Sequence, residues 1–237
     1  PKFDITTGEI IGSEALVRWV HPEKGLISPR NFIPIFENNG FITELDYYIF
    51  ETVSKQLDKW RQEGMPILPV SVNVSRADLY DHNLFPNIVR IVDKYNIPHE
   101  DIEFELTESS FISDNHKLVE LTFNLQKGGF HVLMDDFGSG YSSLNSLKDI
   151  KVDVLKIDIN FLPTSKDDER AGKILTSVVS MAQALDLKVV VEGVETRDQA
   201  DFLISIGAYE AQGYFFFRPM PIEDFEKTLK AQLEEAK

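Results

Sequence analysis

The chain has 237 residues, a length that suits a single α/β barrel domain. Its 24 Lys and Arg residues against 39 Asp and Glu residues give a formal net charge of −15, which argues against a basic surface for a nucleic-acid polymer. With no cysteine, disulfides and thiolate metal sites are excluded, and we expect a cytoplasmic protein. No run of eighteen apolar residues predicts a membrane segment, so a segment outside this chain would have to supply any membrane tether.

The first predicted element is a β-hairpin over Phe3–Ile11, with its turn at Thr7-Gly8. After it, short apolar runs alternate with longer segments of helical period. The predicted strands are Glu9–Arg18, Leu68–Val74, Ile102–Leu106, His131–Asp135, Val154–Ile157, Lys188–Val191 and Ala211–Phe216. The predicted helices are Leu45–Arg61, Leu84–Tyr95, Leu118–Lys127, Ala171–Leu185, Asp198–Ile206 and Ile222–Glu234.

This alternation of strands and helices predicts an α/β protein with right-handed crossovers and a parallel sheet. Seven such strands in this length favour a TIM-like (β/α)8 barrel, with an open doubly wound sheet as the alternative. Because the chain starts with a hairpin, we expect the barrel to begin with an antiparallel pair.

Acids, amides and one lysine repeatedly close the apolar strands. They are Glu14, Asn73, Glu105, Glu108, Asp135, Asp136, Lys156, Asp158, Glu192, Glu195 and Gln212. Any one acid after a strand is often only a helix N-cap. However, the C-terminal strand ends of a parallel barrel open onto one face, where such residues would converge. Charged residues within apolar strands are costly to bury unless they are paired or bound to metal, so we expect a shared partner.

These side chains offer carboxylate and amide oxygens, which suit Mg²⁺ or Mn²⁺ and suit Zn²⁺ poorly. The adjacent acids Asp135 and Asp136 are the natural bridge between two ions. Two metal ions can activate water and stabilise the leaving oxygen in a displacement at phosphorus, so the pattern predicts phosphoester hydrolysis. Lys156 could instead form a Schiff base, but acidic neighbours would keep it charged, so we expect it to hold the attacking water or a phosphate oxygen.

Seven strings of residues resemble, in order and over nearly the whole chain, the motifs of EAL-domain phosphodiesterases. They are Glu14-Ala15-Leu16-Val17-Arg18-Trp19, Asn73-Val74-Ser75, Glu105-Leu106-Thr107-Glu108, Asp135-Asp136-Phe137-Gly138-Ser139-Gly140-Tyr141-Ser142-Ser143, Lys156-Ile157-Asp158, Glu192-Gly193-Val194-Glu195-Thr196 and Gln212-Gly213-Tyr214. The resemblance implies one EAL domain over residues 1–237, a TIM-like barrel with an antiparallel first strand, and hydrolysis of cyclic di-GMP to linear pGpG. It also implies two Mg²⁺ or Mn²⁺ ions, with Ca²⁺ expected to inhibit.

The resemblance further implies a role for each matching residue. The ligands of one ion would be Glu14, Asn73, Glu105 and Asp135, and those supporting the second ion would be Asp135 and Asp136. Glu192 would be the general base or a water-mediated ligand, Lys156 would orient the water, and Gln212 would place water or substrate. Arg18 would contact a phosphate, and Asp158 would lie on the substrate side. Glu108 would anchor the loop Phe137–Ser143, which in the family couples dimerisation to metal binding, so a homodimer is expected.

Two other functions stay open: a degenerate EAL domain that is a cyclic di-GMP receptor, and a regulatory or dimerisation module. The chain opens at Pro1-Lys2-Phe3, where the family carries a Tyr-Gln-Pro-like stretch whose glutamine contacts the ligand. We therefore expect a fragment of a longer signalling protein that lacks the start of the first strand. We expect that strand to be edge-like, so that the fold tolerates the loss while KM rises.

Overall fold

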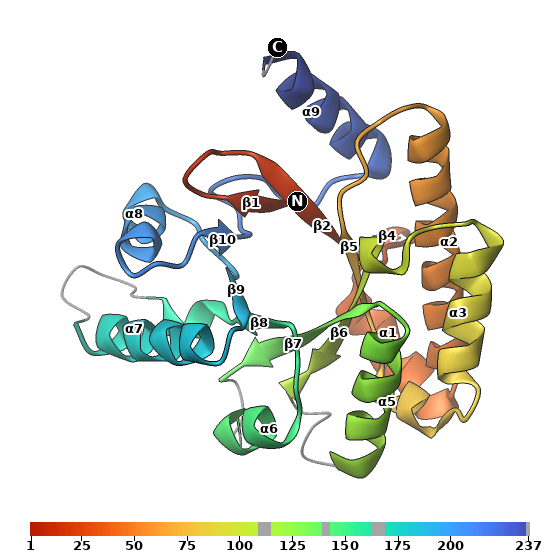
Figure 1. Ribbon diagram of the computed structural model, residues 1–237. Helices are drawn as coiled ribbons and strands as arrows, with labels where there is room; N and C mark the ends of the chain where they lie inside the picture. Colours follow the sequence, from red (N-terminus) through yellow and green to blue (C-terminus); the bar gives the residue numbers. More distant parts are fainter. Residues whose placement is uncertain (109–114, 139–142, 163–168, 236–237) are drawn as a thin grey trace.

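The computed structural model describes residues 1–108, 115–138, 143–162 and 169–235, in which eight strands close into a barrel with helices around its outside (Figure 1). The barrel strands are β1 (Lys2–Asp4), β2 (Ile10–Ala15), β5 (Val70–Asn73), β6 (Ile102–Thr107), β7 (His131–Phe137), β8 (Val154–Ile157), β9 (Lys188–Val191) and β10 (Glu210–Ala211). Closure confirms the predicted TIM-like barrel, and the open-sheet alternative is wrong.

The strand order around the barrel is β1-β10-β9-β8-β7-β6-β5-β2. Strand β1 runs antiparallel to both of its neighbours, while β2, β5, β6, β7, β8, β9 and β10 are parallel to one another, as expected. The predicted hairpin is present: Gly8 has φ 77° in its turn, and its N–H donates to the Asp4 carbonyl at 2.8 Å. The expectation of an edge-like strand is wrong, because Phe3 pairs with Ile10 on one side and with Ala211 on the other.

All six predicted helices are present within a few residues of their expected bounds. The α-helices are α1 (Pro29–Asn39), α2 (Ile42–Gln62), α3 (Leu84–Lys94), α5 (Asn115–Lys127), α6 (Ser143–Asp149), α7 (Glu169–Ala184), α8 (Arg197–Ser205) and α9 (Ile222–Glu235). Short 3-10 turns lie at η1 (Arg76–Tyr80), η2 (His99–Asp101) and η3 (Ile159–Phe161). No helix in the described ranges is long and apolar enough to cross a membrane.

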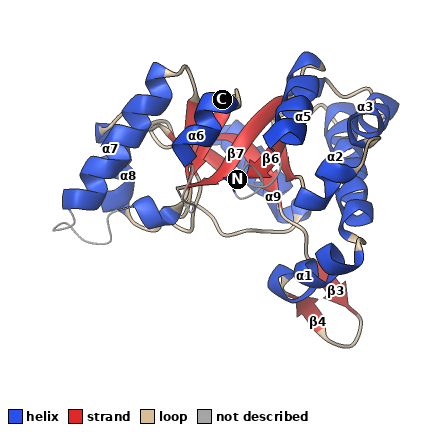
Figure 2. Cartoon of the chain, turned by 90° about the horizontal axis from the view of Figure 1, so that it is seen from below, coloured by secondary structure: helices blue, strands red, loops and turns tan. Residues whose placement is uncertain are grey.

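Helices α1 and α6 and the hairpin of β3 (Trp19–His21) and β4 (Gly25–Ile27) were not predicted. This hairpin and α1 stand away from the barrel (Figure 2). They follow the predicted strand Glu9–Arg18, which is shorter than expected, because β2 ends at Ala15 and residues 16–18 form a loop. The last predicted strand is also shorter: β10 ends at Ala211, and Gln212 accepts a backbone hydrogen bond from Val194 at 3.1 Å as the chain turns.

The strands alternate between two buried environments, because successive strand residues face opposite sides of the sheet. One face packs against the helices and belongs to the main apolar core, as with Phe104, Val132 and Leu155. The other face fills the barrel, where an apolar layer is formed by Leu133, Val154 and Val190. The residues two positions further along the chain from these three are charged: Asp135, Lys156 and Glu192.

Candidate active site

Five carboxylates meet inside the barrel mouth, at the C-terminal ends of four strands. We call them the acidic cluster: Glu14 of β2, Glu105 of β6, Asp135 and Asp136 of β7, and Glu192 directly after β9. Asn73 of β5, Lys156 of β8 and Gln212 after β10 lie among them. The structure thus brings together all eight residues that were predicted as metal ligands or catalytic groups.

The Lys156 ammonium lies at the centre of the acidic cluster. It donates to Glu105 Oε2 at 2.6 Å and lies 2.9 Å from Glu192 Oε1, with the other pairs at 3.0 Å to Asp135 Oδ1 and 3.5 Å to Glu14 Oε2. Its side chain is 1% exposed. Burial disfavours the charge, but the surrounding carboxylates outweigh it and raise the pKa of Lys156 well above its ordinary value. A charged ammonium is a poor Schiff-base nucleophile, so the geometry argues against that alternative.

Two amide side chains connect the cluster across the mouth. Gln212 Nε2 donates to Glu14 Oε2 at 2.8 Å and to Glu192 Oε1 at 2.6 Å. Asn73 Nδ2 donates to Glu14 Oε1 at 3.3 Å. Glu14 is therefore held by strands on both sides of β2 before any ligand enters.

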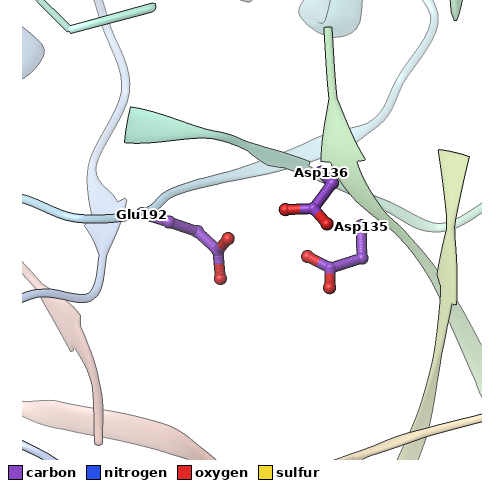
Figure 3. A group of neighbouring side chains, drawn as sticks. All are labelled: Asp135, Asp136 and Glu192. Atoms are coloured by element: carbon purple, nitrogen blue, oxygen red, sulfur yellow. The ribbon is translucent and has the colours of Figure 1, made fainter. Parts of the chain in front are cut away.

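A bulge in β7 explains how two successive acids face the same site. Met134 pairs with Leu155 and Phe137 pairs with Ile157. Between these two pairs, β7 contains one more residue than β8. The extra residue is absorbed at Asp136, whose φ is 56°. Carboxylate oxygens of Asp135, Asp136 and Glu192 consequently lie within 4.8 Å of one another, and the three side chains converge in Figure 3.

The cluster holds more negative charge than the barrel interior stabilises. Burial raises the pKa of Glu105 to about 7 and that of Glu192 to about 8. Burial and the neighbouring Asp135 also raise the pKa of Asp136. The pKa of Glu14 is lowered instead, because Lys156, Gln212 and the other donors outweigh its burial. Without further cations, the cluster therefore takes up protons near neutral pH.

The donor set fits divalent cations that prefer oxygen. Glu105 Oε1 is a buried oxygen that accepts no hydrogen bond from the described residues, and it lies 3.8 Å from the Lys2 ammonium. Buried acceptors without donors are rare unless something else satisfies them. Carboxylate and amide oxygens are the ligands that Mg²⁺ and Mn²⁺ prefer, and Asp135, Asp136 and Glu192 are close enough to share one ion.

Three predicted site residues lie outside this group. Arg18 is exposed and lines a cavity of about 740 Å³ that also reaches Asn73. Asp158 is half-buried, and its Oδ1 accepts from the Asn160 N–H at 2.7 Å. Glu108 is fully buried, and its Oε2 accepts from the Gly138 N–H at 2.8 Å, as an anchor for the following loop would. Residues 139–142 of that loop, Ser139 included, lie outside the described residues.

Sequence reasoning missed a second buried ammonium, that of Lys2 on β1. Its side chain is 5% exposed, and Nζ lies 2.8 Å from Glu103 Oε2 and 3.8 Å from Glu105 Oε1. The side chain crosses Gly12, where an added Cβ would lie 3.6 Å from Lys2 Cδ. The one available signal was the strand period, because Lys2 pairs with Gly12, two residues before Glu14 on the same face.

Comparison with known proteins gives the family. The EAL domain profile matches residues 1–219. The chain is 37% identical over 229 residues to the cyclic di-GMP phosphodiesterase PdeR of Escherichia coli, covering 97% of this chain and 34% of PdeR. It is 36% identical over 225 residues to the cyclic di-GMP phosphodiesterase RocR of Pseudomonas aeruginosa, covering 95% of this chain and 57% of RocR. It thus spans about a third of PdeR and less than two thirds of RocR.

Solved structures of EAL proteins resemble this chain over most of its length. The PaMucR phosphodiesterase in complex with c-di-GMP superposes with a TM-score of 0.88 at 33% identity, covering 95% of this chain and 91% of that one. An EAL enzyme with cAMP and cyclic di-GMP bound gives a TM-score of 0.90 at 28% identity, covering 97% of this chain and 63% of that one. With the barrel, the converging strand ends and a profile match over most of its length, the chain belongs to the EAL domain family.

Proposed function

We propose that this domain is a metal-dependent phosphodiesterase that hydrolyses cyclic di-GMP to linear pGpG. The observation that carries the proposal is the acidic cluster, which gathers oxygen ligands from four strands around one buried ammonium. Relatives named as cyclic di-GMP phosphodiesterases support the substrate. The absence of cysteine supports a cytoplasmic location.

In this proposal each predicted residue keeps its role. Glu14, Asn73, Glu105 and Asp135 would hold one Mg²⁺ or Mn²⁺ ion, and Asp135 with Asp136 would support a second. When bound, the ions would supply Lewis acidity and lower the pKa of the attacking water.

Two contacts support Glu192 as the general base. Its carboxylate lies 2.9 Å from the Lys156 ammonium and accepts from Gln212 at 2.6 Å, so it is held within the site, where it would accept the proton of the attacking water. Lys156 would hold the same water. The water oxygen would bond to phosphorus while the P–O3′ bond breaks, which leaves the 5′-phosphate of pGpG.

Arg18 and Asp158 would act on the substrate side. The Arg18 guanidinium lies at the cavity wall, and its planar fork suits a phosphate. Arg18→Ala is therefore expected to raise KM for cyclic di-GMP more than it lowers kcat. Asp158 is the weaker candidate, because its Oδ1 is already engaged by the Asn160 N–H.

The deciding experiment is incubation with cyclic di-GMP and Mg²⁺ or Mn²⁺, with chromatography for pGpG. We expect turnover that a chelator abolishes, and loss of turnover in Glu14→Ala and Asp135→Ala. Glu195→Ala is the matched control, because Glu195 is an exposed carboxylate after the same strand as Glu192. Tight binding of cyclic di-GMP without formation of pGpG would establish the receptor alternative. Undiminished turnover in excess chelator would refute the metal mechanism.

We also propose that the domain forms a homodimer. The support is an apolar groove of about 390 Å³ on α6 and α7, where the exposed side chains of Leu144 and Ile174 lie beside Met181. Light scattering on protein eluting from a size-exclusion column should give twice the monomer mass. The Ile174→Lys variant should give a mass closer to that of the monomer. A monomeric wild-type protein at micromolar concentration would refute this proposal.

A further inference from the structure

The bulge in β7 places Asp136 in an uncommon backbone conformation. Its φ of 56° lies in the left-handed region, which is less favourable for an L-residue than the right-handed region. Were the bulge to relax into a regular strand, Asp135 and Asp136 would face opposite sides of the sheet. With the bulge formed, their carboxylates converge on that of Glu192 (Figure 3), so contacts that keep the bulge formed also keep this arrangement.

Two side chains, those of Glu108 and Phe161, contact Gly138, which lies two residues after Asp136. The buried Glu108 carboxylate accepts from the Gly138 N–H at 2.8 Å. The Phe161 ring also lies against Gly138. A Cβ added to Gly138 would lie only 1.8 Å from Phe161 Cε2 and 2.1 Å from Cζ, so the ring occupies the space that any side chain would need. Gly138 also has φ 94°, so its conformation favours glycine.

Phe161 is itself placed by the end of β8, the strand that carries Lys156. It is the last residue of η3, and its N–H donates to the Asp158 carbonyl at 3.1 Å. The Asp158 carboxylate accepts from the Asn160 N–H at 2.7 Å, which fixes the start of the same turn. The Phe161 ring is half-buried and packs on the main core, so it is rigidly supported.

We propose that Phe161 is a positioning residue for the acidic cluster: its ring and the Glu108 carboxylate clamp Gly138 and thereby keep the β7 bulge formed. This extends the proposed function, because it assigns the metal-binding geometry of Asp135 and Asp136 to a residue that offers no ligand atom. It also gives Asp158 a structural role, as the residue that shapes the turn carrying the ring.

The first test needs no metal and no substrate. In wild-type protein, the Gly138 N–H is protected by its hydrogen bond to Glu108. In Phe161→Ala, we expect amide hydrogen exchange in the segment 131–138 to be about tenfold faster or more. Phe202→Ala is the matched control, because Phe202 is also a half-buried phenylalanine packed on the core, but on α8. It should leave exchange in this segment unchanged.

The second test is calorimetric titration with Mn²⁺, well below the unfolding temperature of each variant. Phe161→Ala should weaken Mn²⁺ binding by about 10-fold to 100-fold, as loss of supporting residues around metal ligands does. Phe161→Leu keeps an apolar side chain at this position without adding an atom at Cζ, and it should lose less Mn²⁺ affinity than Phe161→Ala. Phe202→Ala should bind Mn²⁺ like wild type even if its unfolding temperature falls.

The possible results distinguish the positioning role of Phe161 from the proposed phosphodiesterase activity. Unchanged exchange and Mn²⁺ affinity in Phe161→Ala, or an equal loss in Phe202→Ala, would overturn the proposal. A wild-type protein that binds no Mn²⁺ would overturn it too. A wild-type protein that binds Mn²⁺ but forms no pGpG would refute the proposed phosphodiesterase activity alone, and the exchange and titration results would still decide the clamp.

Discussion

Replacing Lys156 by methionine is the sharpest test of the electrostatics of the site. The substitution keeps an unbranched side chain of similar length and removes only the ammonium. In the metal-free protein this ammonium lies within 3.5 Å of oxygens from four carboxylates, and its side chain is 1% exposed. Lys156→Met should therefore leave buried carboxylates without their counterion.

The expected loss is large relative to the stability of a domain. Removing one partner of a buried ion pair costs roughly 3–5 kcal/mol, because the other charge stays buried and uncompensated. Domains unfold with a free energy of about 5–15 kcal/mol, so the metal-free variant should lose a large fraction of its stability. For a protein of this size, that loss corresponds to a drop in Tm of roughly 6–20 °C.

The loss should depend on pH in a defined direction. Glu105 and Glu192 have pKa values of about 7 and about 8 in the folded protein, raised by burial from an ordinary value of 4.5. Groups with a raised pKa contribute stability that is complete at low pH and is lost as pH rises through the folded pKa. Lys156 lowers both pKa values, so its removal raises them further. The deficit of Lys156→Met should thus be small near pH 5 and should grow up to about pH 8 and beyond.

Urea denaturation with chelator present, at several pH values, measures this directly. Saturating Mn²⁺ should narrow the gap between variant and wild type, since the cation replaces the lost positive charge. Lys173→Met is the control, because the Lys173 pair with Glu169 is exposed and should contribute nothing measurable. A metal-free Lys156→Met protein as stable as wild type at pH 8, or equally destabilised at pH 5 and pH 8, would refute this account.

Three further substitutions and one exchange of metal ion should give defined results. Glu192→Gln should lower kcat by about 100-fold or more, as loss of a general base does, with Mn²⁺ affinity by calorimetry less affected. Gly213→Ala should lower the free energy of unfolding in urea by about 1–3 kcal/mol, because its Cβ would lie 2.2 Å from the Val194 carbonyl oxygen. Glu226→Ala should cost about 1–3 kcal/mol in the same assay, since Glu226 Oε1 accepts from Trp60 Nε1 at 2.9 Å and from two other donors that tie α9 to α2. Ca²⁺ in place of Mg²⁺ should stop pGpG formation in the chromatographic assay, because a larger ion with looser coordination fits this geometry poorly.

The strand and helix pattern was sufficient to predict the barrel, because its signal repeats along the whole chain. Short elements gave no such signal. The β3–β4 hairpin presents Val20 and Leu26 to solvent, so its residues follow no burial pattern that a sequence could reveal. Strand β10 stops after two residues although an apolar run begins at Tyr214, because the chain turns there: the N–H groups of Phe216 and Phe217 donate to the Gly213 carbonyl.

For the site, eight of the eleven residues that the sequence placed at the strand ends converge, because strand ends of a parallel barrel share one face. The sequence could not predict how successive acids share that face. The bulge at Asp136 and its support by Phe161 arise from contacts between β6, β7 and β8 that no local pattern encodes. Lys2 was missed for a related reason, since its role depends on Glu103, a hundred residues away.

The charge of the site explains how an acidic protein could accept an anionic substrate. The acidic cluster carries five negative charges when fully ionised, and the Lys156 ammonium offsets one of them. The Lys2 ammonium lies 2.8 Å from Glu103, which is outside the cluster, and 3.8 Å from Glu105, so we count its charge with Glu103. Four negative charges remain, so the metal-free mouth repels a phosphodiester, and the raised pKa values of Glu105 and Glu192 are the sign of that excess. One divalent cation would leave two negative charges, whereas two would neutralise the cluster. Substrate affinity should therefore rise with the second ion, and by linkage the substrate should tighten the binding of that ion by the same factor.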